Sequence, residues 1–151
     1  MLPMQSVHPL LVHFPIALLI ASLFFECLAW IFRIEAWRLT ARWCLVAGTL
    51  GATAAVWSGL RAEQVAKHSF EIYQVLELHE KLGITVLVIS GVLSLWWLVS
   101  LKWPRSFFSR PLYIAFLVLT VTLLAFGAYL GGRLVYEFDV GKITVSHSHS
   151  D

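Results

Sequence analysis

Charge is scarce in this sequence. Only 13% of its 151 residues are Asp, Glu, Lys or Arg, against about a quarter in ordinary soluble domains. The 11 Lys and Arg residues nearly balance the 9 Asp and Glu residues, so no basic excess suggests binding to nucleic acid. Cysteine is scarce too. Cys27 and Cys44 lie in apolar runs, where we expect buried small side chains and neither a disulfide framework nor a zinc site.

Hydrophobic residues dominate instead. They make up 59% of the chain, and the mean hydropathy is +0.78, which is typical of an integral membrane protein. A spanning helix needs roughly 20 predominantly apolar residues. The sequence therefore predicts an all-α, four-helix membrane bundle in which residues 1–151 form one domain. Its predicted spans are residues 9–32, 39–60, 79–101 and 111–136. The long polar connection before the third span is predicted to be either an interfacial helix or an extension of that span.

The positive charges predict an orientation in the membrane. One side carries six basic residues in or beside two short connections, and short loops are what the positive-inside rule weighs. They are Arg33, Arg38, Arg42, Lys102, Arg105 and Arg110. We therefore expect this side to be cytoplasmic, with both termini periplasmic, in a multi-pass protein of the bacterial inner membrane. No Lys or Arg precedes the first span, so that span lacks the charged region of a signal peptide.

Four histidines fall at one membrane face. The stretch "HPLLVHFPIALL" places His8 and His13 at the start of the first span, His79 opens the third, and His68 lies just before it. Ionisable residues inside a membrane are costly and are candidates for function. His13 and His79 lie in apolar runs, so we take them as the candidate metal ligands, with His8 and His68 as alternates.

Proline complicates the first span. His8 and His13 are about 140° apart on a helix, so they can face one small site only where the helix is broken. Pro15 removes a backbone hydrogen bond and clashes with the preceding turn. Two alternatives follow: the span begins at Pro15 after a short entry turn, or the helix is kinked beside His13.

Two histidines on different helices are a common axial pair for haem iron. The sequence offers a slot beside them, because Gly83 follows His79 by four residues and Ala17 has the same relation to His13. Other small residues suit either a slot or close helix packing: Ala47, Gly51, Ala55, Gly59, Gly127 and Gly131. Arg61 and Arg133 end spans at the same face, where they either pair with haem propionates or snorkel and complement their helix termini.

Two other interpretations stay open. Three or four histidines at one face suit zinc or copper, and Glu77 and Glu80 flank His79. Alternatively, the chain is a cofactor-free accessory subunit of a membrane complex. Glu26, well inside the first span, is interpreted as a proton-relay group, a snorkelling residue or a partner of Arg42.

The motifs "HPLLVHFPIALL" and "GGRLVYEFDVG" resemble the bacterial four-helix membrane family known as domain of unknown function 2231. Nearly the whole chain is covered, and His79 in "ELHEKLG" is similar to the family's histidine at the third span. Members are often fused to periplasmic c-type cytochrome or Rieske domains. The resemblance therefore implies respiratory or photosynthetic electron transport, but it supplies no reaction.

The sequence thus predicts a subunit that binds haem b (heme b) near the periplasmic face through His13 and His79. Gly83, Arg61 and Arg133 complete the predicted cofactor site. We expect its partners to be the lipid bilayer, a quinone and a periplasmic cytochrome c or Rieske protein, within a larger complex or a homo-oligomer. The alternative is a non-haem zinc or copper protein.

Overall fold

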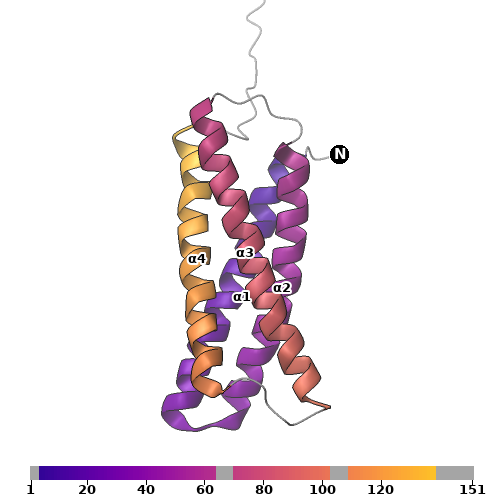
Figure 1. Cartoon of the computed structure of the whole chain (residues 1–151), viewed down its shortest axis with the longest axis vertical. Helices are drawn as coiled ribbons and strands as arrows, with labels where there is room; N and C mark the ends of the chain where they lie inside the picture. Colours follow the sequence, from indigo (N-terminus) through magenta and orange to yellow (C-terminus); the bar gives the residue numbers. More distant parts are fainter. Residues whose placement is uncertain (1–3, 64–69, 103–108, 139–151) are drawn as a thin grey trace, which may run out of the picture.

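Four long helices make up the fold (Figure 1). The computed structural model describes residues 4–63, 70–102 and 109–138, except the side chains of residues 4–10, 62 and 63. The helices are α1 (Met4–Phe32), α2 (Glu35–Glu63), α3 (Phe70–Ser100) and α4 (Arg110–Tyr136). All four are long and apolar enough to cross a membrane. They confirm the predicted four-helix membrane bundle.

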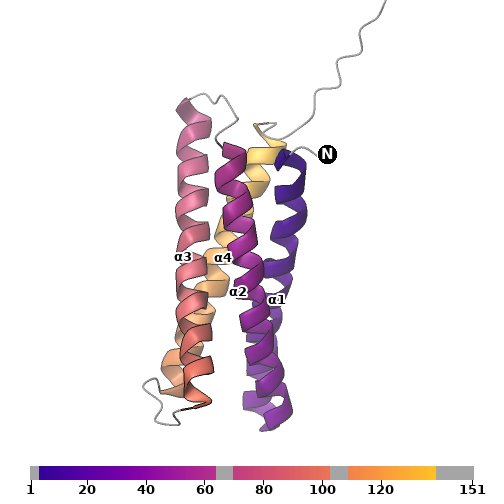
Figure 2. The ribbon, with the colours of Figure 1, turned by 90° about the vertical axis from the view of Figure 1, so that its right-hand side faces the viewer.

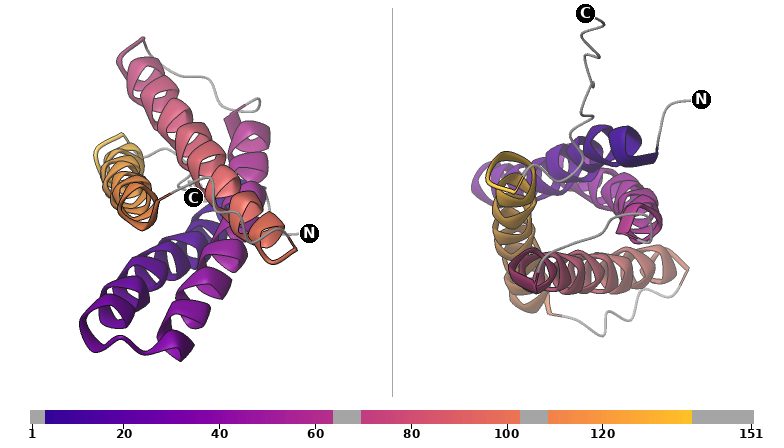
Figure 3. Two further views of the ribbon diagram at one scale, coloured as in Figure 1. Left: turned by 60° about the horizontal axis from the view of Figure 1, so that its bottom comes forward. Right: turned by 90° about the horizontal axis from the view of Figure 1, so that it is seen from above.

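The helices form a ring in chain order. α1 packs against α2 and α4, and α3 packs against the same two helices, so α1 and α3 are diagonal to each other (Figure 3). Successive helices run antiparallel. The end of the bundle where α1 and α3 begin and α2 and α4 end is called the histidine end below. The opposite end, where α4 begins at Arg110, is called the arginine end.

Glycines bring α1 and α2 close together, as Figure 2 shows. A Cβ atom built on Gly48 would lie 3.0 Å from Leu19 Cδ2, and one on Gly51 would lie 3.2 Å from Pro15 Cδ. Pro15 is buried in this contact. α1 is nevertheless α-helical from Met4 to Phe32, so the predicted entry turn before Pro15 is wrong. The interpretation of Gly51 as a close-packing residue is confirmed.

α3 includes part of the polar connection before the third span. It starts at Phe70, so for residues 70–78 the predicted extension of the third span is confirmed and the alternative of an interfacial helix is wrong. Residues 64–69 of the connection lie outside the described part. Unpaired backbone groups are costly at a membrane, and continuing the helix satisfies them within α3.

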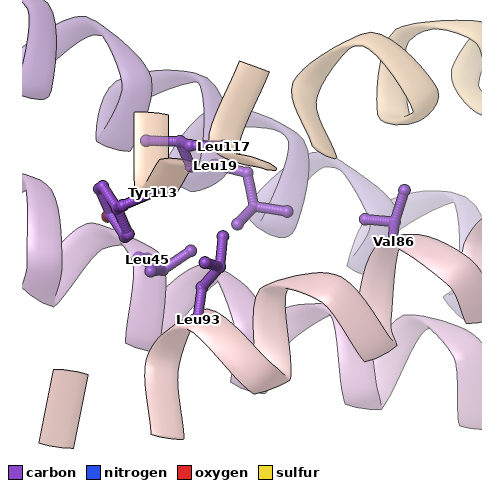
Figure 4. Close-up of a cluster of buried hydrophobic side chains, with 6 residues drawn as sticks. All are labelled: Leu19, Leu45, Val86, Leu93, Tyr113 and Leu117. Carbon is purple, nitrogen blue, oxygen red and sulfur yellow. The ribbon is translucent and has the colours of Figure 1, made fainter. Parts of the chain in front are cut away.

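The hydrophobic core lies between the four helices (Figure 4) and reaches toward the arginine end, because Tyr113 lies in the first turn of α4. Its buried side chains come from all four helices: Leu19, Leu45, Val86, Leu93, Tyr113 and Leu117. Large apolar side chains are also exposed, including Phe24 and Leu95, which is expected where the surrounding solvent is lipid. Cys27 is exposed and Cys44 is half-buried. The predicted burial of Cys27 is therefore wrong, because an apolar residue in a membrane helix can face lipid as readily as protein.

Candidate functional site

His79 joins α3 to α4 at the histidine end. Its ring atom Nδ1 lies 2.9 Å from the carbonyl oxygen of Gly127. A carbonyl oxygen can only accept a hydrogen bond, so Nδ1 carries the proton and donates it. In a neutral imidazole, Nε2 is then the unprotonated nitrogen with the lone pair. This hydrogen bond therefore fixes the tautomer in which Nε2 can act as a ligand.

Two glycines on α4 face α3, and one of them, Gly131, makes room for the imidazole. Gly127 and Gly131 are four residues apart and so share one face of the helix. A Cβ atom on Gly131 would lie 3.0 Å from His79 Cε1 and 3.5 Å from Nδ1. A Cβ on Gly127 would meet Leu82 Cβ at 3.7 Å. The two glycines predicted to line a cofactor slot thus lie against α3, and Gly131 allows the approach of the His79 ring.

His13 lies at a similar depth on α1. His13, His79 and Gly127 are each about two and a half turns from the end of their helix at the histidine end. The His13 side chain is exposed, and α1 is diagonal to α3. The buried face of α1 is instead formed by Pro15, Leu19, Ser22, Glu26 and Ala29. His13 is therefore not on the side of α1 that packs into the bundle.

Gly83 lies one turn after His79 and faces α2. A Cβ atom on Gly83 would meet Val56 Cγ2 at 3.8 Å, an ordinary van der Waals distance. Gly83 is half-buried. Its predicted role in a slot beside His79 stays a prediction.

The two arginines at the histidine end have partners on their own helices. The guanidinium carbon of Arg61 lies 5.0 Å from the centre of the Trp57 ring. Arg133 Nε lies 2.8 Å from Glu137 Oε2. Arg133 and Glu137 also line a surface hollow of about 300 Å³ along the last turns of α4. The geometry favours the helix-terminal interpretation of Arg133, and its pairing with a propionate stays a prediction.

The other predicted ligands are distributed as follows. The side chain of His8, and all of His68, His147 and His149, lie outside the described residues. Glu77, which flanks His79, pairs with Lys81 at 2.6 Å. Within residues 11–61, 70–102 and 109–138, no group of three or more His, Cys, Asp or Glu side chains is placed to hold a metal ion. The zinc or copper alternative, which draws also on His8 and His68, stays a prediction.

The family of predicted membrane proteins called DUF2231 matches residues 4–144 of the chain. The chain belongs to this family. No curated protein and no solved structure matches it. Membership of DUF2231 confirms the resemblance carried by the two sequence motifs and supports a membrane location. It assigns no reaction, because the family is described only as a predicted membrane protein.

The sequence of this DUF2231 protein did not predict that His79 packs on Gly131 and donates a hydrogen bond to the Gly127 carbonyl. The spacing of Gly127 and Gly131 was a usable signal, because small residues four apart often mark close contact between membrane helices. The sequence does not give the rotation of α4 about its own axis. This rotation decides which neighbouring side chain contacts the glycines. In the structure that neighbour is the His79 imidazole.

Proposed function

We propose that this chain is a haem b-binding electron-transfer subunit of the bacterial inner membrane, with His79 as an axial ligand. The observation that carries the proposal is the hydrogen bond from His79 Nδ1 to the Gly127 carbonyl. Metal-ligating histidines almost always donate their other ring N–H to a carboxylate, a carbonyl or water. Such a partner fixes the ring and makes the free nitrogen a better ligand.

Haem suits the small number of ligands better than zinc or copper does. The macrocycle supplies four nitrogen ligands of its own, so the protein needs to add one or two axial ligands. Zinc sites need three or four protein ligands, and the described residues hold no such group. When bound, haem would supply reversible one-electron chemistry. The chain itself would hold the iron at Nε2 and exclude water with the apolar side chains around it.

The second axial ligand is proposed to be His13 or His8. His13 is exposed on α1. It can therefore pair with His79 only if α1 rotates about its own axis or a second copy of the chain covers it. His8, the other histidine at the start of the first span, is the alternative partner of His79.

Electron exchange is proposed to occur at one membrane face. All six histidines lie outside residues 14–67 and 80–146, so none belongs to the arginine end. By the positive-inside rule, the histidine end is periplasmic. A quinol near that interface and a periplasmic cytochrome c or Rieske protein are the proposed partners.

A series of alanine variants tests the ligand assignment. The full chain is expressed in haem-replete cells and purified in detergent, and haem content and iron spin state are measured for wild type, His79→Ala, His13→Ala and His8→Ala. We expect His79→Ala to lose haem or become high-spin, and exactly one of the other two to do the same. His147→Ala is the matched control in the C-terminal tail and should resemble wild type. Haem bound equally by all variants would overturn the assignment.

A further inference from the structure

A polar cluster at the arginine end joins all four helices. Its members are Glu26 on α1, Arg42 on α2, Trp96 on α3, and Arg110 and Tyr113 on α4, and it is called the Arg42 cluster below. Glu26 is completely buried. Its Oε2 lies 3.6 Å from Arg42 Nε, and its Oε1 lies 3.7 Å from Arg110 Nε. The interpretation of Glu26 as a partner of Arg42 is therefore confirmed, and snorkelling is wrong.

Tyr113 is held in one direction within this cluster. The guanidinium carbon of Arg42 lies 3.7 Å from the centre of the Tyr113 ring and 5.6 Å from that of Trp96, and the centres of the two rings are 5.7 Å apart. A cation within about 6 Å of an aromatic face is attracted to it. Tyr113 is completely buried, and turning it away would leave the charge of Arg42 uncovered inside the membrane, which is costly. The side of α4 that carries Tyr113 is therefore fixed toward Arg42 and Trp96.

Tyr113 and Gly131 lie on the same side of α4. They are 18 residues apart in the sequence, which is five full turns of an α-helix. The proline of α4 is in its first turn, where it does not interrupt the backbone hydrogen bonds, so the helix turns as one body. Tyr113 meets α3 at Trp96, and Gly131 meets α3 at His79. One rotation of α4 therefore determines both contacts.

Apolar packing selects this rotation only weakly. Leu117 and Leu134 are also buried on α4. Lipid tails are as apolar as a leucine side chain, so a leucine that turns from the protein toward lipid loses close packing and little else. A charged group that loses its partner inside the membrane pays a larger cost. We therefore expect the Arg42 cluster to decide the rotation of α4.

The contact between His79 and α4 is sensitive to this rotation. Cα atoms lie about 2.3 Å from the axis of an α-helix, so a turn of about 30° displaces them by roughly 1.2 Å. The hydrogen bond from His79 Nδ1 to the Gly127 carbonyl is 2.9 Å long, and lengthening by that amount takes it beyond hydrogen-bond range. Without this acceptor, either ring nitrogen of a neutral imidazole can carry the proton.

We infer that the Arg42 cluster sets the rotation of α4 and thereby holds His79 with Nδ1 protonated and Nε2 free. Arg42 and Tyr113 are positioning residues, because they act on His79 through α4 from the other end of the bundle. As a role in ligand binding, the inference rests on the proposed function, since an axial ligand needs an unprotonated Nε2. The tautomer of His79 itself can be measured without haem.

Nitrogen NMR of the imidazole tests the inference. The full chain is expressed with ¹⁵N-histidine and without added haem precursor, and is purified in detergent. Long-range proton–nitrogen spectra at alkaline pH distinguish Nδ1 from Nε2, and His79→Ala identifies the signals of His79. Wild type should show a protonated Nδ1 and an unprotonated Nε2. In Tyr113→Leu, the frequencies of the two nitrogens should move toward each other, because the proton is then shared between them. Tyr113→Phe keeps the ring over Arg42 and should resemble wild type.

A matched control separates positioning from loss of stability. Leu117→Ala removes a completely buried side chain one turn after Tyr113, so it should lower the unfolding temperature and leave the His79 signals unchanged. Equal changes in Leu117→Ala and Tyr113→Leu, or no change in Tyr113→Leu, would overturn the inference.

A second variant applies if Tyr113→Leu does not fold. Arg110→Gln removes the ion pair between α1 and α4 and leaves Glu26 and Arg42 as a neutral pair, and it should also bring the two nitrogen frequencies together. Unchanged signals in folded Arg110→Gln would then overturn the inference. If wild type binds no haem but the nitrogen signals respond as expected, the proposed function fails and the positioning of His79 by the Arg42 cluster stands.

Discussion

Replacing Gly131 by alanine adds one methyl group and tests whether Gly131 is what allows the His79 ring to pack against α4. The new Cβ would lie 3.0 Å from His79 Cε1, which is closer than ordinary contacts allow, and 3.5 Å from Nδ1, which is an ordinary contact distance. The imidazole must therefore move away from α4, which lengthens the 2.9 Å hydrogen bond to Gly127. The imidazole needs to move by only a few tenths of an ångström, so the hydrogen bond is weakened, and its net contribution to stability is about 0.5–1.5 kcal/mol. The helix gains up to about 1 kcal/mol from replacing glycine by alanine, so the two effects oppose each other.

Gly132→Ala removes that ambiguity. A Cβ atom on Gly132 meets nothing within 4 Å, so this variant reports the helix propensity alone. We expect Gly131→Ala to be less stable than Gly132→Ala by up to about 1.5 kcal/mol, measured by denaturant unfolding in detergent. Gly131→Ala should also change the haem spectrum, and Gly132→Ala should not. Equal stabilities and identical spectra would refute the argument that Gly131 holds the imidazole in place.

Three other results are expected. Gly83→Leu should abolish haem binding while membrane insertion persists, because the apolar span is kept and a large side chain one turn after His79 would fill the predicted slot; unchanged haem content would remove Gly83 from the site. Gly48→Leu should cost about 1–3 kcal/mol of unfolding free energy through overpacking against Leu19, whereas Gly91→Leu, where a Cβ meets nothing within 4 Å, should cost little; equal losses would contradict the packing argument. In sealed vesicles with a trapped reductant, the chain alone should not reduce an impermeant external acceptor, because His13 and His79 both lie near one end of helices that must cross a hydrocarbon core about 30 Å thick. Sustained reduction would require a redox group at the arginine end.

The four spans could be predicted from the sequence because the bilayer sets their length. The positions where the helices begin and bend were harder to predict from the sequence. For residues 70–78 the sequence left two alternatives, an interfacial helix or an extension of the third span, and the structure shows the extension, since a helix that leaves the membrane keeps its backbone hydrogen bonds. Pro15 read as a break, but its ring packs on Gly51. A single sequence shows that a proline is present and does not show which partner accommodates it.

The candidate sites were predictable to different degrees. The pairing of Glu26 with Arg42 follows from the helical hairpin, because both lie a similar distance from the α1–α2 turn. The contributions of Arg110 and Tyr113 depend on how α4 closes the ring, which no local pattern encodes. The contacts of His79 with Gly127 and Gly131 likewise depend on the rotation of α4 about its own axis. The sequence predicted that His13 and His79 lie at the same end of the bundle, because both are near the start of their spans. The direction in which each side chain points could be learned only from the structure.

The most direct test of haem binding is a reduced-minus-oxidised absorption spectrum of the purified wild-type chain, combined with metal analysis. The protein should be expressed in haem-replete cells and purified in mild detergent, so that a weakly held cofactor is kept. We predict sharp bands in the reduced state and iron in proportion to protein, with neither zinc nor copper. A featureless spectrum from stable, helical protein without iron would contradict the proposal, and the hydrogen bond from His79 to Gly127 would then serve only to join α3 to α4.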